Sequence, residues 1–215
     1  MRAVVFSEGC PLRCAYCHNP DTWDCREADL CDHTELAKKI IRLYPYIKDG
    51  GVTFSGGEPC LQAEFFTELA KALKEKGLHI ALDTCGEVYN ERVEALLQLV
   101  DLVLVDVKMT TPEDHKRYTG GELSRVFGFL DVLRDAGKPV WIRHVVVPDI
   151  NDTEDDVRAL GKLLEPYSNV KRIELLPFKD LCREKYKALG IEFPLKDTPP
   201  MSSSRTAELQ KLLDI

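Results

Sequence analysis

The sequence predicts a single α/β domain, spanning residues 1–215, in which parallel strands alternate with helices. Six short runs of β-branched or apolar residues are separated by longer segments in which apolar residues recur at helical spacing. The strand runs are almost continuously apolar, which is typical of parallel strands covered by helices. With 215 residues, of which 44% are hydrophobic, the chain is long enough to bury one sizeable core.

The predicted elements follow one another in a regular order. Strands are predicted over residues 3–7, 51–55, 79–84, 102–108, 140–147 and 172–178. Helices are predicted over residues 33–48, 61–77, 90–100, 122–137, 153–167 and 202–215. In the second helix, Phe65, Phe66, Leu69 and Leu73 recur at helical spacing and give one apolar face. Gly77 and Gly137 stand where helices commonly end.

Repeated strand–helix units predict a parallel sheet with helical crossover connections. Such a sheet is either open and doubly wound or rolled into a full or partial barrel, and six units are too few for a complete eight-stranded barrel. In both arrangements ligands bind at the carboxyl ends of the strands. The residues that follow each strand are therefore the candidates for a functional site.

Polar or metal-binding residues accompany every predicted strand. In strand order they are Cys10, Cys14 and Cys17; the Ser-Gly-Gly-Glu-Pro run of residues 55–59; Asp83 and Thr84; Asp106 and Lys108; Arg143; and Lys179. Each group alone has a structural interpretation, such as a glycine turn, a helix cap or an exposed side chain. Because all of these groups share one edge of the sheet, the sequence favours a binding site there.

The charge and the hydropathy pattern narrow the function classes. A formal net charge of −7 gives the chain no general attraction to nucleic acid or to an anionic membrane surface. No apolar run approaches the ~20 residues that cross a bilayer, and the first residues lack the pattern of a signal peptide. We therefore expect a cytoplasmic protein without nucleic-acid or membrane partners.

Eight cysteines are many for a cytoplasmic chain. A disulfide scaffold belongs to short secreted proteins, whereas this chain is long and rich in core residues, so metal or redox use is favoured. Five of the cysteines are scattered and are expected to be small packed residues: Cys25, Cys31, Cys60, Cys85 and Cys182. The other three form one tight group.

That group, Cys10, Cys14 and Cys17, has the spacing C-x3-C-x2-C. A structural zinc site needs four ligands, and the nearby His18, Cys25 or Cys31 remain open as the fourth. Iron–sulfur clusters are also held by cysteine thiolates, usually four. Three thiolates on a 4Fe-4S cluster would leave one iron open to a ligand from outside the protein.

We call residues 9–19, which contain these three cysteines, the cysteine loop. This loop resembles the signature of the radical S-adenosylmethionine (radical SAM) superfamily. The fuller strings CPLRCAYCHNPDTWD, VTFSGGEPCLQ, LDTCG, DLVLVDVK and VWIRHVVVP resemble, in this order, the activating enzymes of glycyl radical enzymes, most closely those of the pyruvate formate-lyase type. The resemblance covers nearly the whole chain. It implies a partial (β/α)6 TIM-like barrel, the radical SAM core.

The resemblance also implies the chemistry. Such an oxidoreductase uses a 4Fe-4S cluster to cleave S-adenosylmethionine (SAM) reductively into methionine and a 5′-deoxyadenosyl radical. The radical abstracts a hydrogen atom from a backbone glycine of the partner, here a glycyl radical enzyme of the pyruvate formate-lyase type. Flavodoxin or ferredoxin is the implied electron donor, and a monomer is expected.

Residue roles are implied by the same resemblance. The cluster ligands would be Cys10, Cys14 and Cys17, and the residues flanking the cluster and the adenine would be Tyr16, His18 and Asn19. The motif that faces the SAM amino group would be Gly56, Gly57, Glu58 and Pro59, in which glycines admit a close backbone approach. Glu58 is expected to be structural more than catalytic.

Further roles fall at the later strands. A monovalent cation, Na+ or K+, would be bound by Asp83, Thr84, Asp106 and the carbonyl of Leu104. Asp106 and Lys108 match positions that contact SAM, and Arg143 matches an arginine near SAM and the substrate peptide. Lys179 stands where relatives often have a histidine, and it would either reach the ribose or adenine of SAM or remain solvated.

Two features bear on the substrate. Relatives carry a stretch resembling SxGTVDGPGIR before the first strand, whereas this chain begins MRAVVFSEGC, so a shortened N-terminus near the glycyl-peptide channel is expected. The chain has no ferredoxin-like insert, which favours the pyruvate formate-lyase type. The alternatives are the activator of another glycyl radical enzyme, a radical SAM enzyme acting on a small molecule or RNA, and a zinc- or cluster-stabilised binding module.

Overall fold

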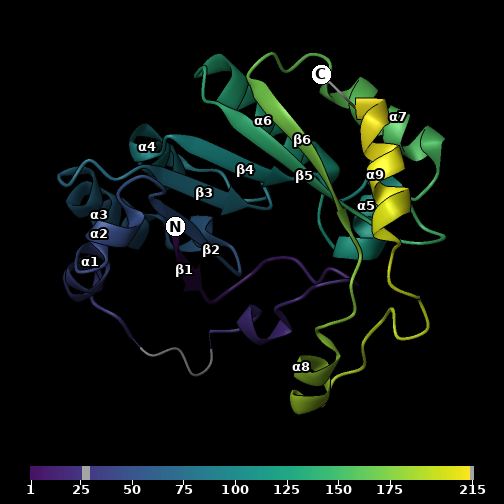
Figure 1. Cartoon of the computed structure of the whole chain (residues 1–215), viewed down its shortest axis with the longest axis horizontal. Coiled ribbons are helices and arrows are strands. Elements are labelled where there is room, and N and C mark those ends of the chain that lie inside the picture. Colours follow the sequence, from purple (N-terminus) through teal and green to yellow (C-terminus); the bar gives the residue numbers. More distant parts are fainter. Residues whose placement is uncertain (26–29, 214–215) are drawn as a thin grey trace.

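The computed structural model describes residues 1–25 and 30–213, and it confirms the predicted α/β alternation (Figure 1). The strands are β1 (Ala3–Ser7), β2 (Val52–Gly56), β3 (Ile80–Thr84), β4 (Leu102–Asp106), β5 (Val140–Val146) and β6 (Val170–Pro177). They form one parallel sheet in the order β1-β2-β3-β4-β5-β6. Within the described residues β1 and β6 do not pair with each other, so the barrel is partial, as predicted.

The helices connect the strands and cover the sheet (Figure 1). They are α1 (His33–Ile41), α2 (Tyr44–Ile47), α3 (Ala63–Lys74), α4 (Glu91–Leu99), α5 (Pro112–Thr119), α6 (Leu123–Asp135), α7 (Glu154–Leu164), α8 (Arg183–Ala188) and α9 (Ser203–Gln210). The described residues also form the 3-10 helices η1 (Pro20–Thr22), η2 (Pro59–Gln62) and η3 (Lys211–Leu213). No helix of the described chain combines the length and apolar character needed to span a membrane.

The first predicted helix is two helices, α1 and α2. Pro45 lies in the first turn of α2. Proline lacks a backbone N–H, and its ring would clash with the carbonyl four residues earlier if a continuous helix passed through it. The helix therefore ends at Ile41 and starts again at Tyr44, where a proline near the N-terminus is tolerated.

Helix α3 shows how the covering layer is packed. Phe66, Leu69 and Leu73 are at most 1% exposed, and Phe65 is partly buried and packs against the same core, which confirms the predicted apolar face. The ring of Phe66 lies 4.6 Å from that of Phe54 on β2. Gly77, after α3, has a φ of +70°, and Gly137, after α6, has a φ of +62°, so both adopt the left-handed conformation expected after a helix.

Strand β5 shows how the two faces of the sheet differ. Val140, Ile142 and Val146 are fully buried beneath helices, whereas Trp141 and Arg143, on the alternate face, are partly exposed. Side chains alternate along a strand, so the second set points into the open barrel. The register pairs Asp106 of β4 with Arg143 and thereby brings an acid and a base together inside the barrel.

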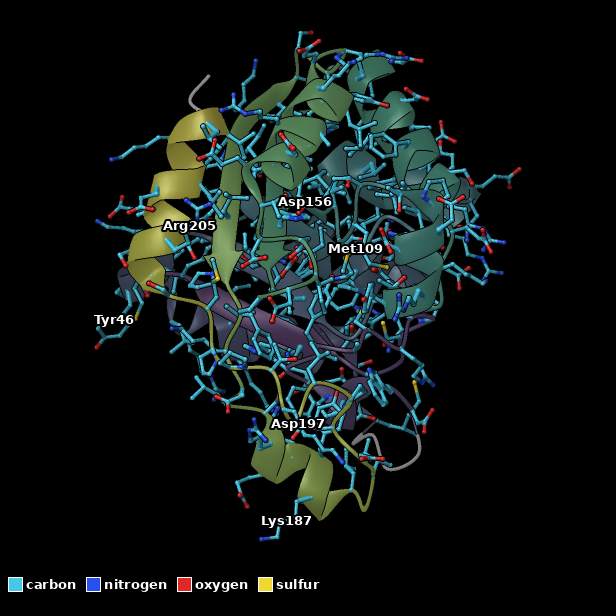
Figure 2. The ribbon with its side chains drawn as sticks, turned by 90° about the vertical axis from the view of Figure 1, so that its right-hand side faces the viewer. Tyr46, Met109, Asp156, Lys187, Asp197 and Arg205 are labelled. Atoms are coloured by element: carbon cyan, nitrogen blue, oxygen red, sulfur yellow. The ribbon has the colours of Figure 1, made fainter. Side chains whose placement is uncertain are left out.

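The segment after β6 returns to the cysteine loop. Helix α8 packs against η1, and the ring of Tyr186 lies edge-on to Trp23 with a centroid distance of 5.9 Å. Lys185 donates to Asp21 at 2.9 Å and to Asn19 at 2.9 Å. Figure 2 shows Lys187 near the tip of α8, at one end of the molecule. The segment that contains α8 therefore supports η1, the 3-10 helix directly after the cysteine loop.

Candidate active site

A cavity of about 390 Å³ lies at the carboxyl end of the sheet. It brings together most of the predicted site residues, namely Cys10, Cys14, Tyr16, Cys17, His18, Asn19, Gly56, Gly57, Asp83, Thr84, Asp106, Lys108 and Arg143. A larger hollow of about 620 Å³ lies between β6 and α9 and contains none of these residues. We assign the candidate site to the smaller cavity because the groups with chemical function converge there.

The cysteine loop leaves β1 and is fixed by backbone hydrogen bonds on two sides. On one side, the N–H of Gly9 donates to the carbonyl of Thr22 at 2.8 Å. On the other, Arg13 and Ala15 each donate, at 2.8 Å, to carbonyls in the last turn of α5. The loop conformation is therefore set by η1, which follows it closely in the sequence, and by α5, which lies much further along the chain.

The three thiols suit a cluster. Cys10, Cys14 and Cys17 are free cysteines, and Cys14 is buried against Leu12. Burial raises the pKa of the Cys14 thiol to about 12 because desolvation disfavours the thiolate. A bound metal centre reverses this preference, since a coordinating thiol is deprotonated outright.

A single metal ion and a cluster need different arrangements of the donor set. In residues 1–25 and 30–213, no group of three or more His, Cys, Asp or Glu side chains is placed to hold one metal ion. The thiolates of a 4Fe-4S cube bind different irons and need not converge on one point. Cys25 and Cys31 were expected to be packed residues and were left open as further ligands, but both are exposed and outside the cavity, so the expectation of packing was wrong for these two. Three thiols beside an open cavity therefore fit a 4Fe-4S cluster.

Three neighbours of the cysteines also line the cavity. The hydroxyl of Tyr16 donates to the carbonyl of Lys108 at 3.1 Å and so ties the loop to the end of β4. The Nε2 atom of His18 lies 2.8 Å from the carbonyl oxygen of Lys179. Asn19 accepts from Lys185. Each of them joins the cysteine loop to a different part of the chain.

A network of two acids and two bases forms the opposite wall. Arg143 donates to Asp106 at 2.9 Å through Nε and also pairs with Asp83. Lys108 donates to Asp106 at 2.9 Å, and the hydroxyl of Ser55 donates to Asp83 at 2.7 Å. We call Asp83, Asp106, Lys108 and Arg143 the charged array. Its formal charges cancel.

The electrostatics of the array follow from burial and pairing. Burial, with the nearby Asp106 carboxylate, raises the pKa of Asp83 to about 6. Burial opposes ionisation of Asp106 as well, but Lys108 and Arg143 outweigh it and lower the pKa of that carboxyl. Asp106 also raises the pKa of Lys108 against the effect of burial. The array thus offers both signs of charge, which suits a zwitterionic ligand with an amino and a carboxylate group.

The two glycines of the Gly-Gly-Glu motif pack against the cysteine loop. A Cβ atom on Gly56, whose φ is +113°, would lie within 3.0 Å of the Ser7 backbone. A Cβ atom on Gly57 would lie within 3.0 Å of the carbonyl oxygens of Gly9 and Thr22. The glycines were predicted to admit a ligand. The structure shows that they are also needed for the backbone that precedes Cys10.

Glu58 is fully buried beneath this contact. Its carboxylate accepts from the N–H of Cys60 at 3.0 Å, the hydroxyl of Thr84 at 2.8 Å and the N–H of Cys85 at 2.7 Å. Its own N–H donates to the carbonyl of Gly9 at 2.7 Å. These bonds join β1, η2 and the end of β3, which is the kind of structural role expected for this residue.

Four predicted site residues do not line the cavity: Glu58, Pro59, Leu104 and Lys179. Pro59 is buried at the start of η2, and Leu104 pairs with Asp83 in the register of β3 and β4. The ammonium of Lys179 lies 3.4 Å from the carbonyl of Met201. The predicted contact of Lys179 with SAM stays a prediction.

The sequence analysis included Ser55 in the polar run after the second strand without giving it a role of its own, and it treated Cys85 as a packed residue. Cys85 lines the cavity and packs with Cys14 and Leu12. Ser55 lines it too and fixes the orientation of Asp83. The alternation of β2 could have indicated that the Ser55 side chain faces the site, because it shares a strand face with Thr53 and directly precedes the glycines.

Comparisons with known proteins agree with this arrangement. The family model of the Radical SAM superfamily matches residues 4–161. The pyruvate formate-lyase-activating enzyme of Clostridium pasteurianum is 41% identical over 215 residues, which cover 99% of this chain and 90% of the relative. The enzyme of the same name from Streptococcus mutans serotype c is 40% identical over 222 residues, covering 99% of this chain and 84% of the relative.

A solved structure supports the fold. A domain of pyruvate-formate lyase-activating enzyme from Bacteroides vulgatus ATCC 8482 superposes with a TM-score of 0.63 at 24% identity, covering 76% of this chain and 92% of that one. The resemblance and the fold expected from the sequence are thereby confirmed. This chain belongs to the radical SAM superfamily and, within it, to the family of the pyruvate formate-lyase-activating enzymes.

Proposed function

We propose that this chain is the activating enzyme of a glycyl radical enzyme of the pyruvate formate-lyase type. One observation carries the proposal: the cysteine triplet and the charged array line the same cavity. A site with thiolate ligands on one wall and paired charges on the other can hold a cluster beside a zwitterionic cosubstrate. The names of the relatives supply the partner and the reaction type.

Cys10, Cys14 and Cys17 would hold a 4Fe-4S cluster, with one iron left open to SAM. When bound, the cluster supplies the electron that cleaves SAM into methionine and a 5′-deoxyadenosyl radical, which removes a hydrogen atom from the partner's glycine. The chain binds and orients these groups and keeps water away from them. Water is kept away by the apolar part of the cavity wall, which includes Leu12, Val145 and Leu176.

Lys108 and Arg143 would orient the carboxylate of SAM. Both line the cavity, and their charges are held in place by Asp106 before any ligand arrives. Such preorganised charges stabilise a bound anion without the cost of reorganising solvent. Tyr16, His18 and Asn19 would flank the cluster and the adenine, and the backbone at Gly56 and Gly57 would face the amino group.

A monovalent cation, Na+ or K+, would bind between Asp83 and Asp106, with Thr84 and the carbonyl of Leu104. In the structure, the guanidinium of Arg143 pairs with both carboxylates. A cation there would take over part of this pairing and free Arg143 to meet the SAM carboxylate. The proposal is supported by the hard oxygen donors of the two acids.

The remaining expectations complete the proposal. A single radical SAM domain over residues 1–215 would act in the cytoplasm as a monomer and take electrons from flavodoxin or ferredoxin. The glycine loop of the partner would enter the open barrel. Val4 and Phe6 of β1 are 50% and 60% exposed, so the open barrel offers apolar surface for that loop.

The test is anaerobic reconstitution with iron and sulfide, followed by incubation with SAM, a reductant and pyruvate formate-lyase. We expect a glycyl radical doublet in the electron paramagnetic resonance (EPR) spectrum. Cys14→Ala removes a buried ligand and abolishes the doublet, whereas Cys31→Ser, which changes an exposed cysteine outside the cavity, leaves it unchanged. A doublet that survives Cys14→Ala would contradict the cluster assignment. If the doublet is obtained only with a different glycyl radical enzyme, that enzyme, and not pyruvate formate-lyase, is the partner.

A further inference from the structure

A buried acid–histidine pair lies beside the cysteine loop, outside the candidate site. The Nε2 atom of His115, on α5, lies 3.1 Å from the Oε1 atom of Glu87, which follows β3. The two side chains are 0% and 4% exposed. The other ring nitrogen of His115 has no hydrogen-bond partner among the described residues. The orientation of the ring therefore depends on Glu87.

Glu87 also fixes the turn after α5. Its Oε1 atom accepts from the N–H of Glu122 at 2.6 Å. Within the turn, the hydroxyl of Thr119 donates to the carbonyl of His115 at 2.6 Å and accepts from the N–H of Gly121 at 3.0 Å. The pair thus holds both the last turn of α5 and the residues that follow it in one arrangement.

This turn is in close contact with the cysteine loop. A Cβ atom on Gly121 would lie within 3.0 Å of both the Glu87 carboxylate and the Leu12 side chain, so no space separates them. Leu12 is 2% exposed and packs on Cys14. A continuous series of contacts runs from the buried pair through Gly121 and Leu12 to a proposed cluster ligand.

The backbone follows the same route. The N–H groups of Arg13 and Ala15 donate to the carbonyls of Thr119 and Tyr118 in the last turn of α5. The two donors lie on either side of Cys14. A shift of the α5 terminus would therefore move the backbone of Cys14 as well as its side-chain packing.

We propose that Glu87 and His115 are positioning residues that set the place of Cys14 through Gly121, Leu12 and the end of α5. The pair touches neither the cavity nor its proposed ligands, and it acts only through the loop. This inference rests on the proposed function in one respect, namely that Cys14 binds the cluster.

The test compares two glycine-to-alanine variants of the reconstituted protein. Gly121→Ala places a methyl group against Glu87 and Leu12, whereas a Cβ on Gly128, in α6, would meet no atom within 4 Å. We expect Gly121→Ala to release iron to an anaerobic ferrous chelator about tenfold faster, since changes to the groups that support metal ligands have effects of this size. We also expect an altered EPR spectrum of the reduced cluster. Gly128→Ala should match the parent protein in both measurements.

A second pair of variants separates positioning from loss of stability. Glu87→Gln keeps an oxygen that can accept from His115 and Glu122, so we expect it to retain the parent iron-release rate. Glu87→Leu removes the acceptor and should release iron as fast as Gly121→Ala. Asn169→Ala, which removes the hydrogen bond from a buried amide to Lys138, should lower thermal stability without changing the spectrum.

The outcomes distinguish the two proposals. If the parent protein binds no 4Fe-4S cluster, the proposed function fails. If the parent binds one and both Gly121→Ala and Glu87→Leu keep its release rate and spectrum, only the positioning role is overturned. If Gly121→Ala does not fold, the comparison of Glu87→Leu with Glu87→Gln decides, and equal rates for those two variants overturn the proposal.

Discussion

The two ends of the sheet carry ion pairs between the same types of residue, but these pairs serve different purposes. At the amino end, Asp101 accepts from Lys74 at 2.7 Å and from the N–H of Ile80 at 2.7 Å. Arg2 donates to the carbonyls of Gly50 and Val52, which joins β1 to the start of β2. These bonds connect elements of the chain to one another, and no predicted site residue lies beside them.

At the carboxyl end, the charged array connects three strands and also faces the cavity of about 390 Å³. Asp106 is held as firmly as Asp101, yet its partners Lys108 and Arg143 line space for a ligand. The difference between the ends that matters for binding is therefore the space beside the ion pairs. Paired charges stabilise the fold at one end, and at the other they are also available to a cosubstrate.

The largest effect is expected from Arg143→Met, which breaks the array. It leaves Asp83 and Asp106 buried and near each other without their shared cation, and loss of one partner of a buried pair costs about 3–5 kcal/mol. We expect SAM cleavage, measured as 5′-deoxyadenosine formed per folded protein, to fall about 100-fold, because a preorganised charge at the ligand is lost. Arg143→Lys keeps the charge but not the two-pronged geometry and should lie between Met and the parent.

The matched change at the amino end is Asp101→Asn. It weakens an ion pair that is about one-third exposed and one backbone hydrogen bond, so unfolding free energy should fall by only about 1 kcal/mol. Formation of 5′-deoxyadenosine should equal that of the parent. A large loss of SAM cleavage in Asp101→Asn would show that the two ends are not independent.

The fold and much of the site at the carboxyl end could be predicted from the sequence. The strand runs and the rule that ligands gather at carboxyl ends placed Asp83, Asp106 and Lys108 at one edge, and all three line the cavity. The fold could be predicted because each strand run is almost continuously apolar and separated from the next by a helical segment. These patterns are local, so they can be recognised without knowing the tertiary structure.

What the sequence did not show depends on contacts between distant segments. Helix α5 was missed because its residues are almost all polar or charged and show no apolar periodicity, although Thr111 as a cap and Pro112 in the first turn were available signals. Nothing near Gly57 in the sequence indicates that it packs on Gly9, and nothing near Glu87 indicates His115. Such pairs become visible only when loops from different strands meet.

An intermediate effect is expected from Gly57→Ala. The methyl group would collide with the carbonyls of Gly9 and Thr22, which are rigid backbone, and overpacking of this kind costs about 1–3 kcal/mol. The cysteine loop should shift, so we expect less iron per protein after reconstitution. Gly77→Ala is the control at the amino end, since its φ is +70° but its Cβ would meet nothing within 4 Å. It should cost about 1 kcal/mol of stability and leave iron content unchanged.

The smallest effect is expected in the pH dependence of stability, to which a histidine at each end of the sheet contributes. His144 is 1% exposed; its Nδ1 atom lies 2.6 Å from the carbonyl of Val107, and its Nε2 atom lies 3.0 Å from Asn151. Burial lowers its pKa below the ordinary value of 6.5, so on acidification the unfolded chain takes up a proton before the folded chain does. Stability should therefore be full above pH 6.5 and fall below it, by at most about 1.4 kcal/mol per pH unit for this one group.

Denaturant unfolding measured between pH 5 and pH 8 would test this dependence. His144→Gln should reduce the loss of unfolding free energy that occurs as the pH falls below 6.5. The pKa of His79, at the amino end, is also lowered by burial and by Arg2, but its side chain is exposed, so His79→Gln should reduce that loss less. If His79→Gln had the larger effect, the acid-sensitive part of the fold would lie at the amino end, and the carboxyl end would be the more tolerant of added charge. That result would contradict the division of roles between the two ends, because a site built to hold a charged ligand depends on the fixed geometry of its buried hydrogen bonds.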